Sequence, residues 1–121
     1  MRRFAFALLV ALCACTSARP DAVTQAQGHE VDLYVSPGVS GENNDVRVEI
    51  RGSRIPDISE LDLTMPDMSM VPQRVALKED GGGSYSASAV RFSMAGTWHV
   101  SVRERTGSGA REFAVLDVTV R

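Results

Sequence analysis

Cysteine is almost absent from this chain: its two copies, Cys13 and Cys15, both lie near the N-terminus. No disulfide can therefore join distant segments, so a folded domain has to be stabilised by its hydrophobic core. An excess of positive charge is missing too, because 13 lysines and arginines face 15 aspartates and glutamates, a formal net charge of -2. Without a basic stripe, we expect no nucleic-acid partner.

Signatures of catalysis are lacking as well. The chain has two histidines, no glycine-rich phosphate loop and no G-x-S-x-G nucleophile elbow. Serine and aspartate are common, but no spacing among them singles out a catalytic triad. The acidic residues between 57 and 67 do not follow the D-x-D-x-D-G pattern of a calcium loop. We therefore predict a protein that is not an enzyme and does not bind calcium.

The N-terminus has the three parts of a secretory signal. Arg2 and Arg3 precede an apolar run from Phe4 to Leu12, and small residues follow. This run is far shorter than the roughly 20 apolar residues that cross a bilayer. We predict that residues 1–14 are a signal peptide, whose removal takes away two arginines and changes the net charge from -2 to -4.

Residues 12–15, LCAC, resemble the lipobox of bacterial lipoproteins, in which the final cysteine becomes the first residue of the mature chain. Cys15 is the better candidate for lipidation, because a cut before Cys13 would leave the bulky Leu12 where a small residue is needed. The resemblance implies a lipid-anchored protein on the periplasmic side of the bacterial cell envelope. Thr16, in place of a retention-type aspartate, favours the outer membrane over the inner one.

Between this N-terminus and the first strand-like run lies a polar segment. Residues 16–28 are small and polar without a sustained apolar period, which is typical of chain that does not bury enough surface to order itself. We predict that residues 15–28, beginning with the lipidated cysteine, form a flexible tether. The folded domain is then expected to comprise residues 29–121.

From Val31 onward the hydrophobic period is two, which is typical of half-buried strands. The last run changes phase between Val115 and Leu116, which predicts a β-bulge or a bend where the inward face changes. About seven strands separated by turns predict an all-β, immunoglobulin-like β-sandwich with Trp98 as its core anchor, and a barrel is the alternative. The runs are 31–35, 46–50, 61–65, 75–77, 85–89, 98–102 and 113–120.

The segment 65–70, MPDMSM, carries three thioethers in six residues. Met68 and Met70 are two positions apart, so in an extended chain they would point to the same face. Thioether sulfur favours Cu(I), and it remains a ligand in an oxidising compartment where thiols would be consumed. Candidates for a further ligand are Met65, Met94, His99 and His29.

These methionines also allow a purely structural interpretation. Methionine is an adaptable filler of irregular cores, and Pro66 and Pro72 would then shape the edge of a sheet. In this second hypothesis the domain is an interaction module of the envelope without metal, and an exposed strand edge recruits a partner by β-augmentation.

Four segments together resemble the YtkA-like domain, which is related to the FixH and CopC-like β-sandwiches. They are similar to it over about residues 31–103, and they are Gly41-Glu42-Asn43, Met65 to Met70, Gly83 to Ala87, and Phe92 to Trp98. The resemblance implies an immunoglobulin-like sandwich on the outer side of the cytoplasmic membrane. It also implies a protein partner in copper handling or in the assembly of copper-containing respiratory complexes.

Carried over residue by residue, the resemblance marks the three methionines of segment 65–70 as a soft-metal patch and Gly96 and Trp98 as structural. Many family members have a histidine or a further methionine within the methionine loop, whereas here Asp67 and Ser69 occupy those places. Only thioethers therefore remain as soft ligands in this segment.

We expect the mature protein to carry an acyl group on Cys15, which the mass of its N-terminal peptide measures directly. Treatment with globomycin should retain residues 1–14 and change the gel mobility. An unmodified mature N-terminus would contradict lipidation and favour the alternative, an ordinary secreted protein cut after Ala14 or Ala18.

Overall fold

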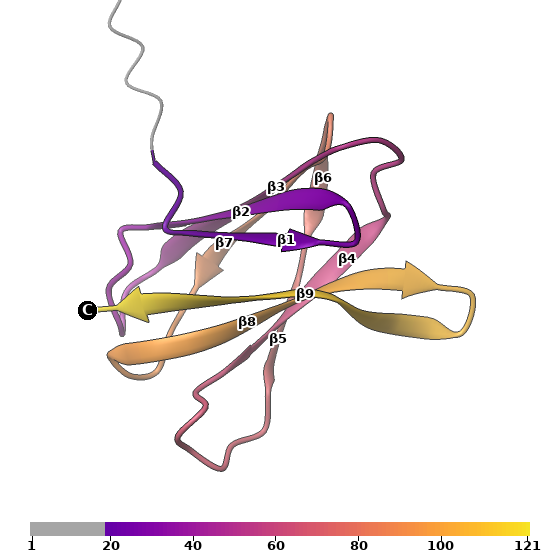
Figure 1. The fold of residues 1–121 in the computed structure, drawn as a ribbon. Coiled ribbons are helices and arrows are strands. Elements are labelled where there is room, and N and C mark those ends of the chain that lie inside the picture. Colours follow the sequence, from indigo (N-terminus) through magenta and orange to yellow (C-terminus); the bar gives the residue numbers. More distant parts are fainter. Residues whose placement is uncertain (1–18) are drawn as a thin grey trace, which may run out of the picture.

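The computed structural model describes residues 19–121, and these form two antiparallel β-sheets that pack face to face (Figure 1). One sheet has five strands in the order β1-β2-β3-β7-β6, and the other has four in the order β5-β4-β8-β9. This confirms the predicted all-β sandwich in place of the barrel. No helix within the described residues could span a membrane. The predicted signal peptide, residues 1–14, and Cys15 lie outside the described residues.

Nine strands succeed one another along the described part of the chain. Every pair of hydrogen-bonded neighbours is antiparallel. Short turns connect β1 to β2, β6 to β7 and β8 to β9. The bounds are β1 (Ala22–Ala26), β2 (His29–Ser36), β3 (Asn44–Arg51), β4 (Ile58–Thr64), β5 (Gln73–Ala76), β6 (Lys78–Gly81), β7 (Ser84–Val90), β8 (Gly96–Thr106) and β9 (Gly109–Val120).

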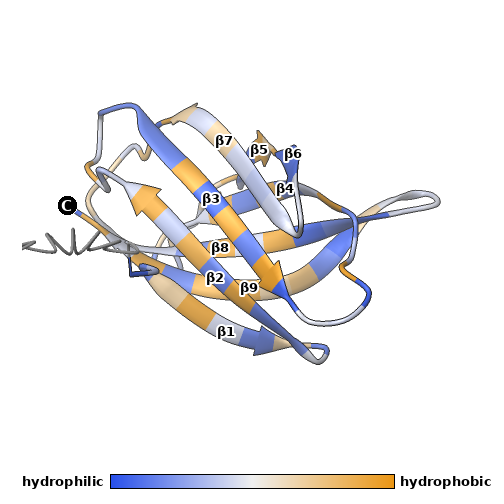
Figure 2. Cartoon of the chain, turned by 90° about the horizontal axis from the view of Figure 1, so that it is seen from above, coloured by the Kyte–Doolittle hydropathy of each residue, from blue (hydrophilic) through white to orange (hydrophobic). Residues whose placement is uncertain are grey.

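Alternation along the strands decides which side chains form the core, as the alternating colours of β2 and β3 show (Figure 2). In β8, Trp98, Val100 and Val102 are at most 1% exposed, whereas His99 between them points outward. The Trp98 ring packs edge to face against Phe92, with 5.3 Å between the ring centroids. Each fully buried large apolar side chain contributes roughly 1.5–3 kcal/mol, so the core holds the two sheets together.

The strand β1 lies in the segment that was predicted to be a tether, so that prediction is wrong for residues 22–28. Its residues pair with β2, from Ala22 opposite Leu33 to Ala26 opposite His29. The segment orders because this backbone pairing and the inward-facing Ala22 and Ala26, which pack against the core, compensate for its low hydrophobicity. The sandwich therefore begins before residue 29.

Besides β1, one more strand was not among the seven predicted, namely β6. The chain leaves the four-stranded sheet at Leu77, whose N–H donates to the Ser59 carbonyl oxygen at 3.0 Å. It then joins the five-stranded sheet, where Lys78 pairs with Ser86. All four residues of β6 are exposed, so no hydrophobic alternation marks it in the sequence.

Of the two predicted alternatives in the last strand, a β-bulge or a bend, the structure has the β-bulge. Val102 of β8 pairs with Ala114, but the next residue of β8 pairs with Glu112, so Phe113 is the extra residue. Phe113 and Ala114 are therefore both buried. The phase changes earlier than predicted, and Val115 faces outward with 41% of its surface exposed.

Several connections meet at one end of the sandwich, which we call the methionine end. Backbone hydrogen bonds join its parts: the N–H of Arg121 donates to Gly38, and the N–H of Gly41 donates to Phe92, each at 2.9 Å. The methionine end comprises Arg121 and the connections 37–43, 65–72 and 91–95. At the opposite end, which we call the far end, Tyr85 donates its hydroxyl to the Pro56 carbonyl at 2.8 Å, and burial raises the pKa of this phenol.

A local irregularity in β7 generates a stability prediction. Ala89 has a φ of 55° where β3 and β7 shift register, and a Cβ atom in this left-handed conformation costs about 1 kcal/mol. Replacing Ala89→Gly should raise the free energy of unfolding by about 0.5–1 kcal/mol in urea titrations. The control Ala87→Gly, at a regular strand position, should lower it. Destabilisation by both variants would contradict strain at Ala89.

Candidate metal centre

The methionine segment forms the connection between β4 and β5. Its first four residues make a turn in which the Met68 N–H donates to the Met65 carbonyl oxygen at 3.2 Å. The turn exposes 46% of Met68 and sends it away from the core, whereas Met70 packs against the core. The prediction that Met68 and Met70 share one face of an extended chain is therefore wrong, because the chain turns between them.

Met65 and Met70 have a packing role. The Met70 sulfur accepts a hydrogen bond from the Met65 backbone N–H at 3.4 Å, so it holds the two sides of the connection together. The methyl group of Met65 lies against Gly96, at 2.8 Å from the position where a Cβ atom would be. Both side chains are partly buried against the core. For these two methionines the structure agrees with core filling.

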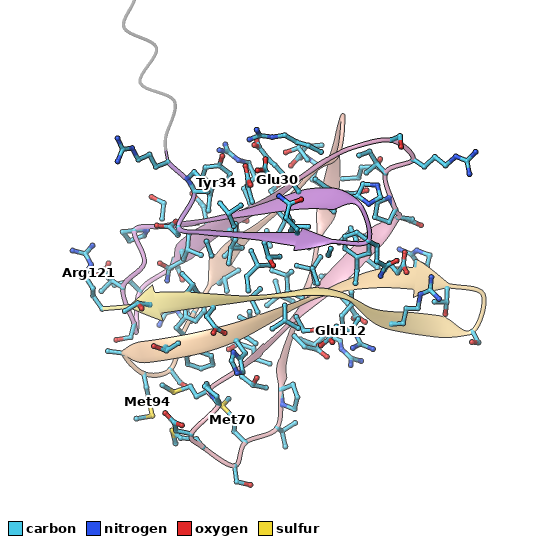
Figure 3. All side chains as sticks on the ribbon, viewed as in Figure 1. Glu30, Tyr34, Met70, Met94, Glu112 and Arg121 are labelled. Atoms are coloured by element: carbon cyan, nitrogen blue, oxygen red, sulfur yellow. The ribbon has the colours of Figure 1, made fainter. Side chains whose placement is uncertain are left out.

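Met94 comes from a different part of the chain but lies at the same end of the sandwich. Its carbonyl oxygen accepts the indole N–H of Trp98 at 3.0 Å, which fixes the backbone of the connection 91–95 over the core. Its side chain is 47% exposed. Figure 3 shows Met70 and Met94 at the same corner, where β4 ends and β8 begins. Every methionine among residues 19–121 therefore belongs to the methionine end.

The two histidines, His99 and His29, lie outside the methionine end. His99 lies on the outer face of the four-stranded sheet, opposite the face of Trp98, and its Nδ1 is hydrogen-bonded to the Asp117 carboxylate. His29 is at the far end, where its Nε2 is 2.7 Å from the Ser53 carbonyl oxygen and its Nδ1 is 3.0 Å from that of Gln27. His29 is thus separated from the methionines by the length of the sandwich.

The exposed side chains at the methionine end include two thioethers, those of Met68 and Met94. Within the part of the chain that the structure describes, no group of three or more histidine, cysteine, aspartate or glutamate side chains could hold a metal ion. The exposed thioethers of Met68 and Met94 are soft ligands of the type that Cu(I) accepts. Met94 was a secondary candidate in the sequence, and only the position of its connection in the fold places it beside the methionine segment.

Comparison with known proteins gives one finding. The family model described as YtkA-like matches residues 24–103. The match begins within β1 and ends within β8, so it includes the methionine segment and the connection that carries Met94. No significant match was found among curated proteins or solved structures.

The contact between Met65 and Gly96 can be tested by substitution. Gly96 has a φ of 137°, which side-chain-bearing residues rarely adopt, and its Cβ would displace the Met65 methyl group. We expect Gly96→Ala to lower the free energy of unfolding by about 1–3 kcal/mol. The loss should be smaller in a Met65→Ala background, where the displaced atoms are missing.

The matched control is Gly107→Ala in the turn between β8 and β9, where a Cβ would meet nothing within 4 Å. Chemical unfolding of the wild type, Gly96→Ala, Met65→Ala and the double variant gives the coupling between positions 65 and 96. A loss at Gly96 that is the same with and without Met65 would show that backbone conformation alone requires this glycine.

Proposed function

Because this chain belongs to the YtkA-like family, we propose that it is a non-enzymatic module of the bacterial envelope that binds Cu(I) through thioethers at its methionine end. The observation that carries the proposal is the gathering of methionines from two connections at one corner of the sandwich. These connections are far apart in sequence, and each has one thioether exposed to solvent.

The four methionines then have two distinct roles. Met68 and Met94 are the proposed ligands, because their sulfurs are on exposed side chains. Met65 and Met70 are the support, because they pack against the core and the Met70 sulfur already accepts a hydrogen bond. Neutral thioethers provide Cu(I) with soft donors but no charge, which suits an ion that is passed on to a partner.

The proposed location gives this chemistry its context. The proposed lipid anchor at Cys15 leaves the mature chain without a free thiol, so soft-metal binding in the envelope would depend on methionine. The partner that we propose is a protein of copper handling or of respiratory complex assembly. It would meet the methionine end, where the exposed thioethers are accessible.

The decisive experiment titrates the chain beginning at Thr16, which lacks the Cys15 thiol, with Cu(I) against a competitive chelator. Among residues 19–121, every buried hydrophobic core residue lies between Val31 and Val120, so this chain keeps that core. We expect the double variant Met68→Leu/Met94→Leu to bind Cu(I) at least about tenfold more weakly while its melting temperature without copper stays unchanged. Leucine keeps the apolar volume and removes the sulfur.

The matched control is Met65→Leu/Met70→Leu, which removes the same number of sulfurs from packed positions. It should lower the melting temperature, because the hydrogen bond to the Met70 sulfur is lost, and it should retain most of the affinity. Equal Cu(I) affinity in the wild type and in Met68→Leu/Met94→Leu would refute the proposed site.

The second candidate function is an interaction module without metal, and the packing of Met65 and Met70 favours it. Here a partner strand would pair with β5, which is an edge strand of the four-stranded sheet and begins next to the methionine segment. Thermal melts separate the two functions: copper should raise the melting temperature of the wild type only if the exposed thioethers bind it.

A further inference from the structure

A groove of about 1010 Å³ lies on the outer face of the five-stranded sheet. Short side chains at outward-facing strand positions form its floor, among them Ser36, Ser86 and Ser88. The chain segment from Val75 to Lys78, which crosses between the two sheets, forms one wall. The groove is hollow because serines replace the long side chains that cover the rest of this face.

Three cationic side chains from separate segments line this groove: Arg19, Arg47 and Lys78. Arg47 is held in place, since its guanidinium lies 4.3 Å above the centre of the Tyr34 ring and 3.3 Å from the Glu49 carboxylate. Arg19 and Lys78 are exposed, and within residues 19–121 neither has an ion-pair partner.

Two carboxylates, Asp21 and Asp45, also line the groove. Asp21 accepts a hydrogen bond from the Val35 backbone N–H at 2.6 Å, so one of its oxygens is turned toward the sheet. Asp45 is exposed. Because Glu49 already pairs with Arg47, the cations available to a ligand are Arg19 and Lys78. The serine hydroxyls add hydrogen-bond donors.

The short stretch of chain between Cys15 and the groove indicates which ligand the groove binds. Arg19 is at the point where the described chain begins, four residues after Cys15. Four extended residues span at most about 14 Å, so an anchor at Cys15 would keep the groove close to the membrane surface. We propose that this groove binds the phosphate of an anionic phospholipid headgroup, and that it thereby sets the orientation of the domain on the membrane. The argument for a lipid source depends on the proposed anchor.

The experiment uses the chain beginning at Thr16, without acyl group or copper, so it does not depend on either part of the proposed function. Cosedimentation is measured with vesicles of phosphatidylcholine alone and of phosphatidylcholine mixed with phosphatidylglycerol. We expect binding to the mixed vesicles, and at least about tenfold weaker binding for Arg19→Gln/Lys78→Gln, because each removes a cation near the surface. Both side chains are exposed, so this variant should fold like the wild type.

The control Arg105→Gln/Arg111→Gln removes two exposed arginines next to the β8–β9 turn, at the far end. It should bind the mixed vesicles as the wild type does.

Titration with inorganic phosphate, followed by amide chemical shifts, should move the signals of Ser86 and Ser88 only weakly. Equal losses in both double variants, or no binding to the mixed vesicles, would overturn the proposal. Tight binding of inorganic phosphate would overturn the lipid source in favour of a soluble anion.

Discussion

The burial of Trp98 is the interaction on which the rest of this structure depends. Its ring is fully buried and packs edge to face on Phe92, so it joins β8 to the core between the sheets. A buried indole needs a partner for its N–H, and here the partner is the Met94 carbonyl oxygen at 3.0 Å. One side chain therefore holds the core together and fixes the connection that carries an exposed thioether.

The need for such a core follows from the lack of any disulfide in the domain. Apolar side chains from both sheets provide the stability, and methionine extends this packing to the end of the sandwich through Met65 and Met70. The flexible thioether of Met65 fits against Gly96, where no Cβ is present. At this corner the methionines that complete the core are neighbours of the methionines that we propose as ligands. Stability and ligand binding are therefore tested with substitutions of different methionines.

The position of the domain relative to its proposed anchor changes once β1 is included in the sandwich. The polar segment before the first hydrophobic run is shortened, because residues 22–26 pair with β2 instead of forming a tether. A short connection holds a domain near a surface, and it restricts which faces can meet that surface. The groove near Arg19 and the methionine end are then two different surfaces, for which we propose different ligands.

The sequence by itself determined the all-β class, most strands and the core anchor. Periodicity of two depends on local chain geometry, so it identifies the strands with a hydrophobic buried face. It also indicated a phase change in the last strand, although the bulge lies at Phe113, earlier than predicted. It could not identify β1 or β6, which are held by pairing with neighbours and bury little surface. Tertiary structure alone decided that Met68 and Met70 separate and that Met94 joins the methionine end, because these placements depend on a turn and on strand register between distant segments.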